Sequence, residues 1–277
     1  MIPSRRDIDD LIEVVRRAGA EVIMPRFRDL ADGEVATKSG PRDLVTVADH
    51  AAEEAIRKGV EQVLPGAKVI GEEAVADNPR LLDAIGSGGT CVIVDPIDGT
   101  GNYVAGLAVF GTILAVVHEG QTVFGLLHDP VLDDWMFAVR GGGAWFRRRN
   151  GTCSRVTTQN AGMVLERATG FVTLEDYDTA TRRIVRQRFD AVSHVRDIRC
   201  SCHEYRLLAS GSVDFLRSFS LKPWDHAAGL LLLEEAGGWA AVDGVHPYSP
   251  TICEGRIVAA GSEALGRDIA DLAVALP

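Results

Sequence analysis

The 277-residue sequence lacks several features that define large classes of protein. No apolar run reaches the roughly 18 to 20 residues that cross a bilayer, and the first residues lead into an amphipathic helix rather than a signal peptide. The five cysteines, at positions 91, 153, 200, 202 and 253, are odd in number and scattered, which argues against a disulfide framework and suits a reducing compartment. We therefore expect a cytoplasmic protein with no membrane partner.

An excess of basic residues is also missing. Lysine and arginine number 29 against 39 aspartates and glutamates, so the formal net charge is −10. A general nucleic-acid binder needs the opposite balance to neutralise phosphates, so we expect no nucleic-acid partner. Carboxylates gathered around one site would contribute to such an acidic excess until cations bind, which favours metals and a small phosphorylated metabolite as partners.

A zinc motif is only half present. Cys200, Cys202 and His203 lie close together, but no second ligand pair follows at a suitable spacing. We predict that these residues pack in the wall of a site. His203 and His226 are interpreted as structural groups, and for His226 a place in a substrate pocket stays open.

What the sequence does contain is a strand-like apolar run, residues 91–94, that ends in two acids three residues apart. A strand delivers its last residues to the rim of a sheet, and the proline after Asp95 fixes the next turn, so Asp95 and Asp98 can face one cavity. Gly99 permits close approach of a ligand, and Thr100 would begin a helix whose first N–H groups attract an oxyanion. Taken alone, these residues also fit an Asp-Pro turn with a helix cap.

Three more segments place acids in similar settings. The apolar run at residues 69–70 leads into Gly71, Glu72 and Glu73, a strongly apolar helix begins near Asp225, and residues 43–49 end in Asp49. Singly, Asp225 and Asp49 fit helix N-caps or first-turn acids. Together these carboxylates suit two or three Mg²⁺ ions, which prefer oxygen ligands.

The order and spacing of these motifs resemble the inositol monophosphatase family, the lithium-sensitive, Mg²⁺-dependent phosphatases. The matching segments cover nearly the full length: Lys38 with residues 43–49, then 71–73, 95–103, 141–145, 222–229 and 234–238. The resemblance implies that Glu72, Asp95 and the carbonyl of Ile97 hold one metal ion. It also implies that Asp95, Asp98 and Asp225 hold a second, with Asp95 bridging the two.

The activity implied by the resemblance is hydrolysis of a phosphomonoester by a metal-activated water, with Mg²⁺ as cofactor and Mn²⁺ as a substitute. Glu72 and Thr100 would orient the attacking water, and Asp49 would support them. Inhibition by lithium and a symmetric homodimer are further expectations. The residues assigned to substrate binding are Ile97, Asp98, Gly99, Thr100, Arg196, Ser201, Ser218 and Asp225.

The leaving group of the substrate is less well defined. In the inositol phosphatases an acid seven residues before the Trp-Asp aspartate contacts the inositol hydroxyls, and here Ser218 holds that place. The alternatives left open are an inositol monophosphate-like substrate, histidinol phosphate, a fructose bisphosphate and a nucleoside 3′,5′-bisphosphate. A non-enzymatic RNA-processing interaction protein on the same fold is a further alternative, but retention of every metal ligand favours an enzyme.

Periodicity along the chain predicts an α/β layered fold. Helices are expected over residues 7–31 and 47–63, and strands around 68–70, 90–94, 110–118, 122–128 and 135–140, the last three as an antiparallel meander. The basic triplet at 147–149 before Asn150-Gly151 predicts a solvated hairpin tip. The resemblance implies an αβαβα sandwich, in which an N-terminal α+β domain (1–150) carries most metal ligands. A C-terminal α/β domain (151–277) would supply Asp225 and the substrate-pocket residues.

Overall fold

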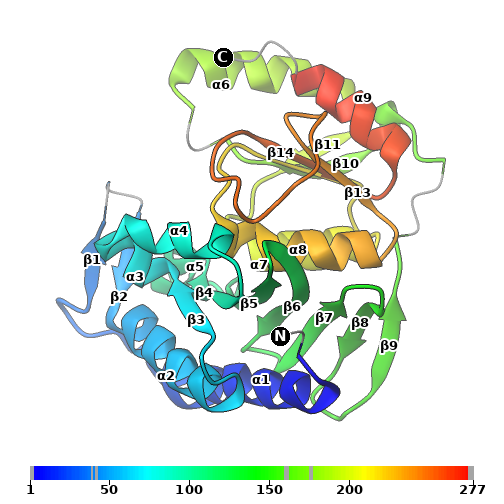
Figure 1. Cartoon of the computed structure of the whole chain (residues 1–277). Helices are drawn as coiled ribbons and strands as arrows, with labels where there is room; N and C mark the ends of the chain where they lie inside the picture. The colour runs from blue at the N-terminus through cyan, green and yellow to red at the C-terminus, as the bar shows by residue number, and fades with distance from the viewer. Residues whose placement is uncertain (1–2, 39, 41–42, 159–161, 175–176, 274–277) are drawn as a thin grey trace.

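Two β-sheets alternate with three layers of helices in this protein (Figure 1). The computed structural model describes residues 3–38, 40, 43–158, 162–174 and 177–273. Two helices cover the outer face of the first sheet, two lie between the sheets and two cover the outer face of the second. In that order they are α1 (Arg5–Ala18) and α2 (Val47–Val63), α7 (Ser201–Ala209) and α8 (Pro223–Glu235), and α6 (Thr179–Arg188) and α9 (Glu263–Ala273). The predicted αβαβα sandwich is confirmed.

The first sheet has seven strands in sequence order: β3 (Lys68–Gly71), β4 (Thr90–Asp98), β5 (Gly111–His118), β6 (Gln121–Asp129), β7 (Asp134–Val139), β8 (Gly143–Arg147) and β9 (Cys153–Val156). Strand β3 pairs with β4 in parallel, and each later pair is antiparallel. The predicted meander is therefore present, and Asn150-Gly151 lies at the tip of the β8–β9 hairpin. Strands β5 and β6 are buried along most of their length because helices cover both faces.

The second sheet has five strands: β10 (Thr169–Val172), β11 (His194–Arg196), β12 (Phe215–Ser218), β13 (Trp239–Val242) and β14 (Ile257–Ala260). Their order across the sheet is β11-β10-β12-β14-β13. The first three run parallel, and β14 is antiparallel to both of its neighbours. Strand β12 is thus central, with its carboxyl end at Ser218.

The helices differ in how much of their surface is buried, according to their positions in the layers. Helix α1 buries one stripe, with Leu11, Ile12 and Val15 against the first sheet, and a capping box formed by Ser4 and Asp7 begins it. Helix α8 is apolar on all sides, with every residue from His226 to Leu233 buried, because it packs between two sheets. This helix carries Asp225 in its first turn.

Some boundaries differ from the prediction. The first helix ends at Ala18 and continues as a π-turn (Gly19–Ile23) and a 3₁₀ turn (Met24–Arg26), because Pro25 has no N–H for a helical ladder. The hairpin of β1 (Val35–Thr37) and β2 (Leu44–Thr46) and the short helices α3 (Glu72–Asp77), α4 (Asp83–Gly86) and α5 (Thr100–Val104) complete the site region. Among the described residues, no helix has the length and apolarity that a bilayer crossing needs.

The division into two domains at residue 150 stays a prediction. Each sheet draws on one part of the chain, residues 68–156 and 169–260. Helix α8 contacts strands of both sheets, so the two parts share a central core.

Candidate functional site

The end of β4 is irregular, and this irregularity aligns its two acids. Asp95 lies opposite Ile113 of β5, whereas Asp98 lies opposite Gly111, so β4 has one extra residue between the two pairs. Side chains three apart on a regular strand point to opposite faces, but one extra residue restores the same face. The hydroxyl of Thr112 donates to the Pro96 carbonyl at 2.9 Å inside this bulge. Asp95 and Asp98 therefore face the same side.

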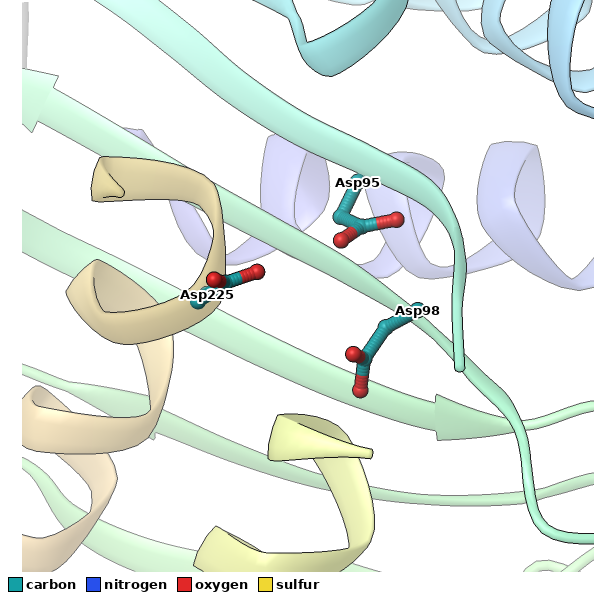
Figure 2. A group of neighbouring side chains, drawn as sticks. All are labelled: Asp95, Asp98 and Asp225. Carbon is teal, nitrogen blue, oxygen red and sulfur yellow. The ribbon is translucent and has the colours of Figure 1, made fainter. Parts of the chain in front are cut away.

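Helix α8 brings a third acid to this pair. Pro223 occupies its first turn, where a missing N–H costs nothing, and Asp225 follows it. One carboxylate oxygen from each of Asp95, Asp98 and Asp225 lies within 4.8 Å of the others. Figure 2 shows the three side chains directed into one space between β4 and the start of α8.

The burial of these acids strongly disfavours their charged forms. Burial, followed by the charges of Glu72, Asp98 and Asp225, raises the pKa of Asp95 well above its ordinary value. Burial also raises the pKa of Asp98 to about 6, although the Cys202 N–H and the Cys200 thiol donate to its carboxylate and oppose that shift. Oδ1 of Asp95 is buried and has no hydrogen-bond partner within the described part of the chain. An oxygen-only donor set with an unpartnered buried oxygen fits a divalent cation.

Glu72 lies in the same cleft, beside rather than inside the three-carboxylate group. It is the first residue of α3, and its Oε1 accepts from Lys38 Nζ at 3.0 Å. Lys38 also donates to Glu73 at 2.7 Å, and burial raises the pKa of Glu73 to about 7. The charge of Glu72 acts on both Asp95 and Asp98, so the four carboxylates form one electrostatic group.

The start of α5 carries the remaining predicted catalytic groups. The Thr100 hydroxyl lies 2.9 Å from the Ile97 carbonyl and 3.2 Å from Asp49 Oδ1. The other oxygen of Asp49 accepts from the Thr46 N–H at 2.8 Å and caps α2. Burial raises the pKa of Asp49 to about 6. Asp49 therefore lies behind Thr100 and fixes its hydroxyl rather than lining the cleft.

Gly99 permits the turn between β4 and α5. Its φ is +86°, a left-handed conformation that a side chain disfavours. A Cβ there would lie 3.0 Å from the Val109 carbonyl and 3.2 Å from Cys200 Cβ. Asn102 ties this turn to the loop before α7 by donating to the carbonyls of Val109 and Ile198 at 2.8 Å.

Cys200 lines the cleft, as predicted, whereas Cys202 does not line it and contributes its N–H to Asp98. Cys200 and Cys202 are buried, and burial raises the pKa of both thiols well above the ordinary value, which disfavours zinc ligation. The Nε2–H of His226 donates to the Ser220 carbonyl at 2.7 Å, and its Nδ1 accepts from the Tyr205 hydroxyl at 2.8 Å. Burial lowers the pKa of His226 to about 4, so it is a neutral structural group.

All of these elements surround a cleft of about 1040 Å³. The predicted site residues that line it are Glu72, Asp95, Ile97, Asp98, Gly99, Thr100, Ser201, Ser218 and Asp225. Arg196 is exposed on the edge strand β11 and does not line the cleft, whereas Arg199 does. Every predicted site residue except Arg196 therefore lies in or next to the cleft. Asp49 does not line it but accepts from the hydroxyl of Thr100, which does.

Several residues of the cleft have no role that follows from the sequence. Burial opposes the charge of Lys222, but Asp225 and Glu72 outweigh it and raise the pKa of Lys222. Glu204 of α7 is a buried acid whose pKa burial raises well above the ordinary value. Arg217 of β12 is completely buried. Only Lys222 and its place next to the apolar helix gave a usable signal, because the other two lie inside ordinary helix and strand patterns.

Comparison with known proteins relates nearly the whole chain to one family. The sequence model described as "Inositol monophosphatase family" matches residues 5–275. A fructose-1,6-bisphosphatase/inositol-1-monophosphatase from Thermotoga maritima is 32% identical over 83% of this chain and 82% of that protein. The Nus factor SuhB of Escherichia coli is 31% identical over 90% of this chain and 88% of its own. The solved Thermotoga maritima IMPase TM1415 superposes with a TM-score of 0.80 at 25% identity, covering 96% and 95% of the two chains.

Proposed function

The chain belongs to the inositol monophosphatase family, and we propose that it hydrolyses a small phosphomonoester in a reaction that needs divalent cations. One observation carries this proposal. Asp95, Asp98 and Asp225 place three buried or half-buried carboxylates within 4.8 Å, and one oxygen of Asp95 has no partner in the described residues. Such a group of like charges is unfavourable unless protons or cations compensate it.

The residues that would hold Mg²⁺, two or three ions with Mn²⁺ as a substitute, are Glu72, Asp95, Asp98, Asp225 and the carbonyl of Ile97. Bound cations would supply Lewis acidity toward the phosphate and lower the pKa of a water. Lys38 holds the Glu72 carboxylate in place. The Thr100 hydroxyl, held between Asp49 and the Ile97 carbonyl, would orient the attacking water together with Glu72.

The phosphate would lie against the backbone of Gly99 and Thr100, which line the cleft where β4 leads into α5. The leaving group would then extend toward Ser201 and Ser218, which line the cleft beside Asp225. The hydroxyl of Ser218 donates to the Ser220 carbonyl at 3.2 Å. A hydroxyl selects a polyol less sharply than a carboxylate does, so the substrate ranges from inositol monophosphate-like compounds to histidinol phosphate, a fructose bisphosphate or a nucleoside 3′,5′-bisphosphate.

Phosphate release from a panel of these metabolites, with Mg²⁺ and with excess chelator, tests the proposal. We expect turnover of at least one compound with Mg²⁺ and none in chelator. Turnover that persists at full rate in chelator would contradict a metal-dependent reaction. Comparison of kcat/KM across the panel then identifies the preferred leaving group.

A second candidate function rests on the similarity to the Nus factor SuhB. A role in RNA processing would use the surface of the fold and would not need the metal ligands. The net charge of −10 disfavours non-specific RNA binding. Absence of any phosphatase activity with Mg²⁺ or Mn²⁺, together with specific RNA or protein binding, would favour this candidate. The homodimer stays a prediction, which sedimentation can test.

A further inference from the structure

Helix α3 begins after a residue that cannot cap it. Its first residue, Glu72, follows Gly71, and a glycine has no side chain to accept from the free N–H groups of the first turn. Serine, threonine, asparagine and aspartate are preferred at that position because their side chains accept from the second or third N–H group. The first turn of α3, which carries Glu72, therefore needs an acceptor from another part of the protein.

Glu53, from the second turn of α2, supplies that acceptor. Its Oε2 accepts from the Glu73 N–H at 2.8 Å, and its Oε1 accepts from the Ala74 N–H at 3.0 Å. The two oxygens of one carboxylate thus take the place of an N-cap side chain, and a negative charge at the start of a helix is itself favourable. Because these two residues directly follow Glu72, the bonds hold its turn of α3 against α2.

Gly71 provides the room for this contact. A Cβ on residue 71 would overlap the carboxylate of Glu53, whose three outer atoms are its nearest neighbours. The φ of Gly71 is −94°, which other residues can also adopt. Glycine is therefore required here by the approach of Glu53 and not by the backbone conformation.

The same face of α2 also holds Thr100. Asp49 lies one helical turn before Glu53, and its Oδ1 accepts from the Thr100 hydroxyl at 3.2 Å. Residues four apart on a helix lie on the same face. One face of α2 therefore contacts both groups that are proposed to orient the attacking water, Thr100 and the turn that carries Glu72. Helix α2 packs on β4 of the first sheet, which makes it a rigid support.

We infer that Glu53 is a positioning residue: by fixing the first turn of α3 against α2, it sets the place of the Glu72 carboxylate at the proposed cation site. This inference rests on the proposed function. Glu53 does not line the cleft, so it acts through the backbone of α3 and not on substrate or metal. Lys38, from the β1–β2 hairpin, holds the side chain of Glu72 at 3.0 Å, whereas Glu53 holds the backbone of its turn.

Binding of Mn²⁺ to the full-length protein, measured through the electron paramagnetic resonance signal of the free ion, tests the inference without turnover. Removal of a group that orients a metal ligand weakens metal binding about 10- to 100-fold. We expect Glu53→Gln to raise the Mn²⁺ dissociation constant about tenfold, because an amide has a single acceptor oxygen and directs N–H groups at the other helix N–H. The matched control, Glu54→Gln, should leave the constant unchanged, because Glu54 is exposed on the same helix and pairs with Arg57 and Lys58.

Gly71→Ala breaks the same contact while it keeps the charge of Glu53. The added methyl group would displace the Glu53 carboxylate, which is the flexible end of its side chain. We therefore expect the same loss of Mn²⁺ affinity, and little further loss when Gly71→Ala is combined with Glu53→Gln, because both remove one interaction. In the assay of phosphate release, the Mg²⁺ concentration for half-maximal rate should rise by the same factor in each variant.

The outcomes separate this inference from the proposed function. A merely structural role of Glu53 would lower the thermal midpoint of both variants and leave the Mn²⁺ dissociation constant unchanged, which would overturn the inference and leave the proposed function intact. Equal Mn²⁺ binding by the unaltered protein and Asp95→Asn would overturn both, since the cation site itself would then be wrong. Gly71→Ala gives the measurement even if Glu53→Gln does not fold.

Discussion

Two buried charged residues of the cleft, Asp95 and Arg217, differ in sign and in the way that the protein surrounds them. Asp95 and Arg217 are both hidden from water, with exposed fractions of 2% and 0%, and both have polar atoms without partners in the described structure. The acids are held by β4, α8 and the start of α7, with the Cys202 N–H donating to Asp98. Arg217 belongs to a single strand and contacts an aromatic ring.

This difference shows that only the acids form a preorganised group. Several elements position them before any ligand binds, which suits cations common to every substrate of such a site. Arg217 instead lies on β12 opposite Val258 of β14, with its Cζ 5.6 Å from the Tyr177 ring centre. Substitutions at the two positions should therefore differ, and the largest effect is expected at Asp95.

Asp95→Asn should reduce kcat/KM about 1000-fold, or about 4 kcal/mol, because it removes a charge from the centre of the proposed cation site. The fold should be retained, since the amide has nearly the same shape. The measurement is phosphate release with Mg²⁺, supported by circular dichroism. The matched control is Asp214→Asn, because Asp214 is also buried but accepts from the Thr169 N–H outside the cleft. A fully active Asp95→Asn enzyme would contradict the assignment of Asp95 to the cation site.

The metal-free protein should lose stability as the pH rises from about 4 to about 6. The pKa of Asp49 is about 6 in the folded state against an ordinary 3.8, so the folded state binds its proton more tightly than the unfolded state does. Its stabilisation is complete below pH 3.8 and is lost as the pH rises through 6, by at most about 3 kcal/mol. Urea unfolding in chelator measures the slope, and Asp49→Asn should flatten it. Equal slopes in the unaltered protein and Asp49→Asn would show that the pKa of Asp49 is not raised in the folded state.

Mg²⁺ at about 100 times its dissociation constant should stabilise the protein by about 2.7 kcal/mol, and a chelator should reverse this. The cation compensates the repulsion among Asp95, Asp98 and Asp225, so the gain should shrink in Asp95→Asn. Thermal unfolding with and without Mg²⁺ gives the comparison. An unchanged midpoint for the unaltered protein at millimolar Mg²⁺ would argue that the acids hold protons instead of metal.

Arg217→Met should leave the protein as stable as before or stabilise it by about 1 kcal/mol, because methionine fills similar space without an unpaired buried charge. Chemical unfolding measures this change. A loss of more than about 3 kcal/mol would indicate that Arg217 is paired in the folded protein.

Much of the candidate site could be predicted because its residues form local patterns. An apolar run that ends in Asp95, a proline and Asp98 is a strand end, and Asp225 at the start of an apolar helix is a first-turn acid. The capping box of Thr46 and Asp49 marked the start of α2 at the predicted position. The resemblance to a known family then placed these segments around one site.

The sequence by itself therefore determined the helices, the strands and the acids, since periodicity and capping act over a few neighbouring residues. Only the tertiary structure decided that a bulge aligns Asp95 with Asp98, that Lys38 pairs with Glu72, and that Arg196 stays outside the cleft while Arg217 lies buried within it. Strand register, burial and pairing depend on segments that are distant along the chain. No local pattern around Arg217 distinguishes a solvated arginine from a buried one, because its neighbours in space come from β10, β14 and α9, which are distant along the chain.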